Sequence, residues 1–177
     1  MKKQIFPINF KYNFDPARRG AKYTLDGEHW LNAGEFVEVA VKSGLGLELH
    51  KDANTSFDEG DDIPEYKASV KSPKFTLTTV NLGDNKDEIV RNYFERTASE
   101  TVVWGFIAGE EVITYWMSMA EFAEYLENWG YFDKHTRYVR GKALSGKMLN
   151  WLDERAEQVR RPGRAIRWGS RALKIRG

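Results

Sequence analysis

The sequence predicts a single α/β domain, spanning residues 1–177, in which a mixed β-sheet is flanked by helices. Helix-like and strand-like apolar patterns alternate along the chain, as expected of such a domain. A length of 177 residues suits one domain and can bury a sizeable core. Charged residues make up 30% and aromatic residues 14%, a balance typical of folded rather than disordered chains.

The first thirty residues are rich in aromatic side chains and show no clear period, so we expect them to be largely irregular. One exception is the dipeptide Asp26-Gly27, which stands between residues 21–25 and residues 28–31. Asp-Gly is a strong signal for a tight turn between two strands. A short hairpin is therefore predicted there.

A helix is predicted to begin after Asn32. Glu35 follows three residues later, which is the spacing of a capping box, where each side chain bonds the other residue's backbone N–H. An apolar run follows and supplies the buried side of the helix. Gly44 and Gly46 are expected to end it.

The rest of the chain continues to alternate between strands and helices. Period-two patterns predict strands, and apolar stripes at a spacing of three and four predict helices. In chain order we expect a short strand at 45–50, strands at 65–72 and 75–80, a helix at 84–97, strands at 101–107 and 111–117, a helix opened by a Ser118–Glu121 capping box, and a last helix at 145–159.

Composition disfavours several classes of protein. The chain has no cysteine, which excludes disulfides and thiolate metal sites and indicates a reducing, cytoplasmic location. No apolar run approaches the roughly 20 residues that a membrane helix needs. The first residues also lack the apolar segment of a secretory signal. We therefore expect an intracellular protein with no membrane partner.

Charges are sorted along the chain, although the net charge is only +1. Acidic residues dominate between residues 52 and 65. Between residues 159 and 177 there are seven Arg or Lys residues and no acid. Such a distribution suits an enzyme that holds a cation in one place and a polyanion nearby.

The strand predicted to begin at Glu65 is the segment that indicates chemistry. Alternation places Glu65, Lys67, Ser69 and Lys71 on one face of this strand. A carboxylate beside a lysine can hold a Mg²⁺ ion and a phosphate oxygen together, because Mg²⁺ prefers hard oxygen ligands. The lysine can then orient the attacking water and offset the developing charge. Asp62, at the mouth of the strand, can add further metal-ligand oxygens.

This segment resembles the active-site hairpin of the PD-(D/E)xK nuclease superfamily, which includes many type II restriction endonucleases. The matching residues are Asp62, Glu65 and either Lys67 or Lys71. Later segments are similar to strands and a helix of small homodimeric restriction enzymes, so the resemblance covers roughly residues 33–142. It implies a restriction-endonuclease-like fold, a mixed sheet flanked by helices, and Mg²⁺-dependent hydrolysis of DNA without a covalent enzyme intermediate.

Two registers are open within this resemblance, because the family usually separates its Asp from its Glu-x-Lys by more than three residues. In the first register, Glu65-Tyr66-Lys67 is the Glu-x-Lys unit. In the second, Lys71 is the catalytic lysine, Ser69 stands in the usual acid position, and Glu65 or a helix glutamate supplies the missing carboxylate. The second is favoured, because Pro64 leaves Glu65 at the end of the strand.

Two glutamates on the first helix are candidates for an additional metal ligand. Members of the superfamily often carry a glutamate on the helix before the sheet, and this nominates Glu35 and Glu38. Glu35 is also explained as a helix cap. Glu38 interrupts an apolar run and has no such explanation, so both a site role and a structural role are open for it.

The basic tail at residues 160–177 is the expected DNA contact. Its cations can neutralise phosphates, and Trp168 can stack on a base. Alternatively, Ile166 and Trp168 pack against the domain and the tail is only a solubilising end. The cations assigned to DNA are Arg160, Arg161, Arg164, Arg167, Arg171 and Lys174.

The sequence therefore predicts a Mg²⁺-dependent DNA endonuclease. A restriction-type enzyme would act as a homodimer, because cutting two strands of a palindrome needs two active sites.

The alternative is a non-catalytic DNA- or protein-binding module on the same fold, from a phage or plasmid, and Ser69 and the short Asp62–Glu65 spacing favour it. A third interpretation, an unrelated small interaction protein, requires the face formed by residues 65–71 to be plain surface. The predicted catalytic residues are Asp62, Glu65, Lys67, Ser69 and Lys71, and the predicted metal ligands are Asp62, Glu65, Glu38 and Glu35.

Overall fold

A computed structural model of the chain describes a mixed α/β protein with four helices and a five-stranded mixed sheet among its elements. No helix within the described part of the chain is long and apolar enough to cross a membrane. The described residues are 1–46, 48–49, 65–69, 76–77, 83–96, 101–135, 138–160 and 167–168, with the backbone alone for 48–49, 65–69, 76–77, 94, 96 and 167–168.

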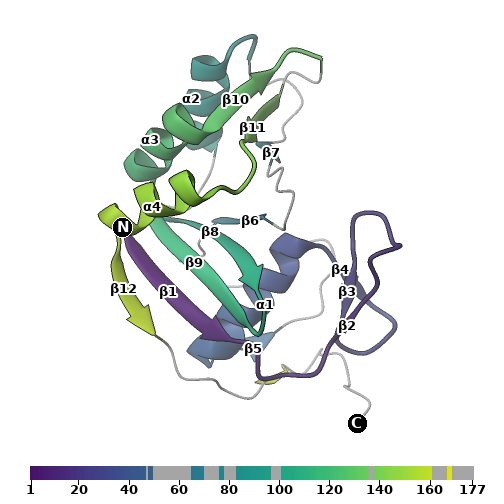
Figure 1. Ribbon diagram of the computed structural model, residues 1–177. Helices are drawn as coiled ribbons and strands as arrows, with labels where there is room; N and C mark the ends of the chain where they lie inside the picture. The colour runs from purple at the N-terminus through teal and green to yellow at the C-terminus, as the bar shows by residue number, and fades with distance from the viewer. Residues whose placement is uncertain are drawn as a thin grey trace.

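The central sheet has the strand order β12-β1-β9-β8-β6 (Figure 1). Strands β8 and β9 form a hairpin whose turn contains Gly109 at φ 60°, and β1 adds antiparallel to β9. The two outer strands, β12 and β6, each run parallel to their neighbour, which makes the sheet mixed. The bounds are β1 (Lys2–Pro7), β6 (Glu65–Ser69), β8 (Thr101–Ala108), β9 (Glu111–Ser118) and β12 (Glu157–Arg160).

Two sequence-based expectations about this sheet were wrong. Residues 1–30 are not irregular throughout, because residues 2–7 form β1 inside the sheet, with Ile5 and Phe6 buried. The last helix, α4 (Gly146–Arg155), ends before residue 159, and the residues after it pair with β1 instead. The free edge of β1 offers backbone donors and acceptors, and satisfying them outweighs the local helical pattern.

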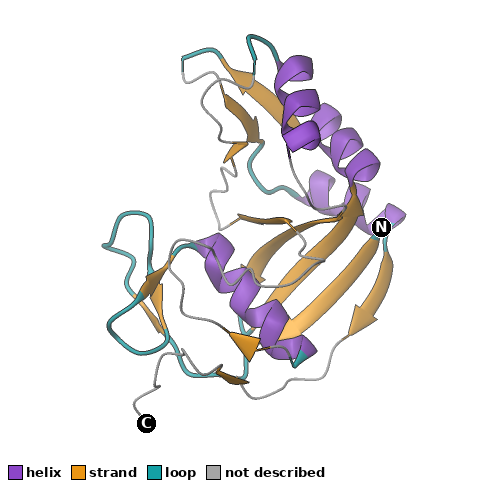
Figure 2. Cartoon of the chain, turned by 180° about the vertical axis from the view of Figure 1, so that it is seen from behind, coloured by secondary structure: helices purple, strands orange, loops and turns teal. Residues whose placement is uncertain are grey.

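Helix α1 (Ala33–Leu45) lies across one face of the sheet (Figure 2). The predicted capping box at Asn32 and Glu35 is present, and Gly46 ends the helix in the left-handed conformation at φ 70°. Gly44 does not end it. A Cβ atom on Gly44 would come within 2.2 Å of the Phe6 ring, so the glycine lets α1 approach β1 closely.

The opposite face of the sheet carries the aromatic half of the core. Val102, Trp104 and Phe106 of β8 pack there in one cluster with side chains of α2 (Lys86–Arg96), α3 (Met119–Trp129) and α4. The alternate position Gly105 faces α1, because a Cβ there would lie 3.2 Å from Val37. The sheet is therefore enclosed between α1 on one side and the later helices on the other.

Three small sheets complete the fold. The predicted Asp26-Gly27 hairpin is confirmed, with Gly27 at φ 80° and a third strand added. The predicted strands at 45–50 and 75–80 are present as β5 and β7, and the helices and strands predicted between 84 and 129 match α2, β8, β9 and α3. The small sheets are β2 (Asn13–Phe14), β3 (Tyr23–Thr24) and β4 (Trp30–Leu31); β10 (Gly130–Asp133), β11 (Tyr138–Gly141) and β7 (Thr76–Leu77); and β5 (Glu48–Leu49) with β13 (Arg167–Trp168).

Candidate functional site

Strand β6, which carries the predicted Glu-x-Lys pattern, is the last strand in the order of the described sheet. Residues paired side by side in a sheet project to the same face. The β8 partners of alternate β6 residues belong to the aromatic core on the side away from α1. Positions 65, 67 and 69 therefore share one face, opposite α1. The pairs are Glu65 with Val102, Lys67 with Trp104, and Ser69 with Phe106.

The intervening positions of β6 face α1. Tyr66 pairs with Val103 and Ala68 with Gly105, and α1 packs against β6 as well as β8. The period-two prediction for this strand thus agrees with the register, since apolar positions are turned toward a helix and polar positions away from it. Two predicted catalytic residues, Asp62 and Lys71, lie outside the described residues, and Glu65, Lys67 and Ser69 are described by their backbone alone.

Glu38 is buried on α1, with 3% of its side chain exposed. Its Oε1 lies 3.2 Å from Nζ of Lys42, which is itself buried. A buried carboxylate needs a compensating partner, and Lys42, one helical turn away, provides the opposite charge. The contact at Oε1 is an ion pair rather than a hydrogen bond. Because α1 and positions 65, 67 and 69 lie on opposite faces of the sheet, the described residues do not group Glu38 with Glu65. The i,i+4 spacing could have identified the Glu38–Lys42 pair from sequence.

Glu35, the other helix glutamate proposed as a metal ligand, serves the helix start. Its Oε2 accepts a hydrogen bond of 2.6 Å from the backbone N–H of Asn32. The Asn32 side chain accepts one of 2.9 Å from the backbone N–H of Glu35. This reciprocal capping accounts for the residue fully, as the alternative interpretation of the Asn-x-x-Glu spacing proposed.

An unpaired donor stands on the same sheet face as positions 65, 67 and 69. The indole N–H of Trp104 is buried and finds no hydrogen-bond partner among the residues that the structure describes. A buried donor without a partner costs about 1–3 kcal/mol. Trp104 is the register partner of Lys67, so this donor lies on the same sheet face as position 67.

A cluster that sequence reasoning did not single out lies in the turn between β3 and β4. Side-chain atoms of Asp26, Glu28 and His29 lie within 4.8 Å of one another. The Asp26 carboxylate, however, already accepts from the Thr24 hydroxyl, from two backbone N–H groups and from the His29 ring. Partial burial alone would raise the pKa of Asp26, but these hydrogen bonds lower it well below its usual range. The cluster is therefore explained as the bonding of a tight turn.

The basic tail is partly tied to the domain. Arg160 ends β12 and its guanidinium lies 3.0 Å from the Glu111 carboxylate, with both side chains exposed. Farther on, residues 167–168 pair in parallel with β5. These contacts agree with the interpretation that the tail packs onto the domain at these points. Of the predicted DNA contacts, Arg161, Arg164, Arg171 and Lys174 lie outside the described residues.

In comparisons with family models, curated proteins and solved structures, nothing matches this chain.

Proposed function

We propose that this protein is a Mg²⁺-dependent DNA nuclease whose active site is built on the polar face of β6. The observation that supports it is the register of β6, in which positions 65, 67 and 69 share one face while α1 covers the other. A carboxylate and a lysine at alternate positions of one strand can hold a Mg²⁺ ion and a phosphate oxygen side by side, as metal-assisted phosphodiester hydrolysis needs. The same strand stands at the end of the described sheet.

The roles follow from the chemistry of the side chains. Asp62 and Glu65 supply hard carboxylate oxygens suited to Mg²⁺, which provides Lewis-acid stabilisation of the phosphate when bound. Lys71 orients the attacking water and offsets charge on the phosphate oxygens. Ser69 and Lys67 contact the phosphate. Glu35 and Glu38 have no role here, because the helix cap and Lys42 already occupy them.

The finer fold assignment belongs to the same proposal. A mixed sheet with α1 on one face and later helices on the other is compatible with a restriction-endonuclease-like fold. Cleavage of both strands of a palindrome requires two sites, and a homodimer provides them. A cytoplasmic location fits the absence of cysteine from the sequence.

Plasmid cleavage tests the proposal. Purified protein is expected to nick or linearise supercoiled plasmid in Mg²⁺ or Mn²⁺, and to leave it intact in EDTA or in Ca²⁺ alone. Lys71→Ala and Asp62→Ala are expected to abolish cleavage without lowering the melting temperature. Lys147→Ala, an exposed lysine on α4, is the control and should cut like the unchanged protein.

The same assay separates the two registers. If Lys71 is the catalytic lysine, Lys71→Ala removes cleavage, whereas Lys67→Ala weakens it through substrate binding. The reverse pattern identifies Glu65-Tyr66-Lys67 as the Glu-x-Lys unit. Cleavage that survives in both variants contradicts a β6 active site.

A second candidate function is a non-catalytic DNA-binding module on the same fold. The serine at position 69, where the family has an acid, favours it. This candidate predicts tight DNA binding in Ca²⁺ together with intact plasmid in Mg²⁺ and Mn²⁺ across many DNA sequences and structures.

A further inference from the structure

The β2–β4 hairpin exposes aromatic rings. The structure describes three exposed large hydrophobic side chains, and two of them, Tyr12 at 36% and Phe14 at 50% exposure, lie at this hairpin. Both rings contact Tyr23, at 6.2 and 5.0 Å between centroids, so they lie on the same face. Two neighbouring rings on one face give this segment a small exposed aromatic surface.

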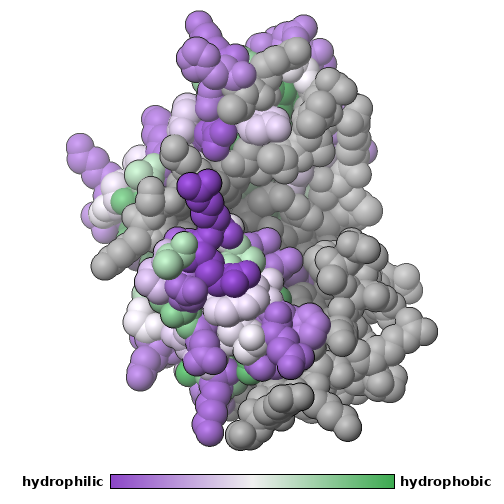
Figure 3. Space-filling view, turned by 90° about the vertical axis from the view of Figure 1, so that its right-hand side faces the viewer, coloured by the Kyte–Doolittle hydropathy of each residue, from purple (hydrophilic) through white to green (hydrophobic). Residues whose placement is uncertain are grey.

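The segment that carries these rings is also charged. Residues 11–31 contain four Lys or Arg residues and three acids, Asp15, Asp26 and Glu28. Asp15 accepts a backbone hydrogen bond from Ala17 and so helps to shape the loop. Lys11 and Arg19 are exposed and form no ion pair with the residues described here. In the space-filling view of this side, hydrophilic residues dominate the described surface, with small apolar patches between them (Figure 3).

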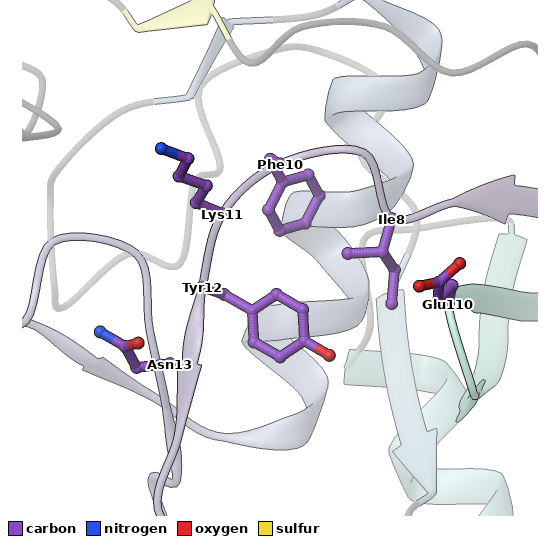
Figure 4. A pocket seen from close by; sticks show the side chains of 6 residues that line it. All are labelled: Ile8, Phe10, Lys11, Tyr12, Asn13 and Glu110. Carbon is purple, nitrogen blue, oxygen red and sulfur yellow. The ribbon is translucent and has the colours of Figure 1, made fainter. Parts of the chain in front are cut away.

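A pocket of about 420 Å³ opens beside the hairpin. Figure 4 shows the rings of Phe10 and Tyr12 along its wall, with Glu110 of the β8–β9 turn at the far side. Asn13 and Lys11 complete the polar part of the lining. The lining therefore mixes apolar and aromatic side chains with polar and charged ones, and Asn13 can bond the edge of a base through its donor and acceptor.

The hairpin is held in shape by its own packing. Tyr23 stacks on Phe36 of α1 at 4.4 Å between centroids, and Tyr12 meets the same ring edge-on at 4.9 Å. In the loop, the Arg18 guanidinium lies 4.0 Å from the centre of the Trp30 ring. These contacts fix the exposed rings on a firm base, so that binding to them costs little ordering.

We propose that the β2–β4 hairpin and its pocket bind an unpaired DNA strand, with bases stacked on Phe14 and Tyr12 and phosphates on Lys11 and Arg19. Stacking on exposed rings requires free base faces, which duplex DNA does not offer. An acidic peptide would satisfy the cations but has no planar groups for the rings. The choice of DNA rests on the proposed function, whereas the surface is independent of the chemistry at β6.

Fluorescence anisotropy in EDTA tests this surface without any contribution from cleavage. The probes are a fluorescein-labelled oligothymidylate and a duplex of equal length. Phe14→Ala is expected to weaken binding of the single strand about tenfold. Tyr131→Ala is the matched control, because Tyr131 is 38% exposed on β10, and it should bind like the unchanged protein.

The cations are tested by salt dependence. Lys11→Ala and Arg19→Ala should each lower the log–log salt slope of single-strand binding by about 0.7. If Phe14→Ala lowers the melting temperature, the Lys11→Glu, Arg19→Glu double variant replaces it in the binding test, because it alters only exposed side chains. Equal affinity of Phe14→Ala and the unchanged protein for the single strand overturns the hairpin proposal, whereas duplex binding that Phe14→Ala leaves unchanged belongs to the proposed nuclease site. If the unchanged protein binds the single strand but does not cleave plasmid, the result counts against the β6 site alone.

Discussion

The two faces of the central sheet differ in the side chains that the structure describes on them. On the α1 face, Glu38 and Lys42 are both buried and lie 3.2 Å apart on one helix. On the other face, the described core of β8 is apolar and aromatic, and positions 65, 67 and 69 of β6 stand beside it. The ion pair with Lys42 is a structural role for Glu38, whereas the candidate site itself was predicted on the strand at 65–71 and stays a proposal there.

The largest expected effect comes from breaking the α1 pair. Glu38→Ala leaves the Lys42 ammonium buried without its partner, which should lower the free energy of unfolding by about 3–5 kcal/mol. Urea denaturation measures the change. A double replacement by methionine, Glu38→Met with Lys42→Met, is the control and should leave stability near or above that of the unchanged protein. If Glu38→Ala keeps its stability but loses Mg²⁺-dependent cleavage, Glu38 is a metal ligand rather than the structural partner of Lys42.

The second prediction tests how closely α1 lies on the sheet. Gly44→Ala places a methyl group within 2.2 Å of the Phe6 ring, so one element must shift. Overpacking of this kind costs about 1–3 kcal/mol. Gly146→Ala is the control, because a Cβ at this first residue of α4 meets no atom within 4 Å. Thermal unfolding should show a lower melting temperature for Gly44→Ala only; equal melting temperatures would contradict the close approach.

The third prediction concerns stability at low pH, which depends on carboxyl groups on the sheet face opposite α1. Asp153 accepts hydrogen bonds from Tyr115 at 2.7 Å and from Lys3 at 2.8 Å. Partial burial alone would raise the pKa of Asp153, but these bonds lower it, and the capping and ion-pair contacts of Glu121 lower its pKa in the same way.

Because both folded pKa values are lowered, the stabilisation is complete above the unfolded values near pH 4 and is lost as the pH falls through the folded values. Melting temperature is expected to drop below about pH 4. Asp153→Asn should flatten this drop, and Glu154→Gln, at an exposed neighbouring position, should not. A pH profile that is the same in Asp153→Asn and in the unchanged protein would contradict this assignment.

The smallest effect is expected at the sheet edge. The Arg160–Glu111 pair is exposed, with relative side-chain areas of 65% and 39%, so Arg160→Ala should cost no more than about 1 kcal/mol. A double-mutant cycle with Glu111→Ala measures the coupling. If Arg160→Ala instead lowers DNA affinity strongly at unchanged stability, the tail contacts DNA from its first residue.

Elements with local signals could be predicted from the sequence. The capping boxes at Asn32 and Ser118 and the turn at Gly27 depend on residues within a few positions of one another, and all three are present. The strands β1 and β12 could not be predicted in this way. Their pairing depends on partners more than a hundred residues away, which no local period records.

The site shows the same division between local and distant information. The alternation along β6 was visible in the sequence, but the face on which it falls depends on the register with β8. Glu38 is different, because its i,i+4 spacing to Lys42 is local information that could have identified the pair from the sequence. The sequence shows that the first thirty residues are rich in aromatic side chains. It does not show that Phe14 is exposed while Tyr23 and Phe36 are buried.

Calorimetric titration with Mg²⁺ and with Ca²⁺ tests the central claim most directly. Three proteins are compared: the unchanged chain, Glu65→Gln, and the Glu38→Met, Lys42→Met double variant. A site on the polar face of β6 predicts that ion binding is lost in Glu65→Gln and kept in the double variant. Binding that survives in Glu65→Gln but disappears in the double variant would contradict it and place the metal on α1.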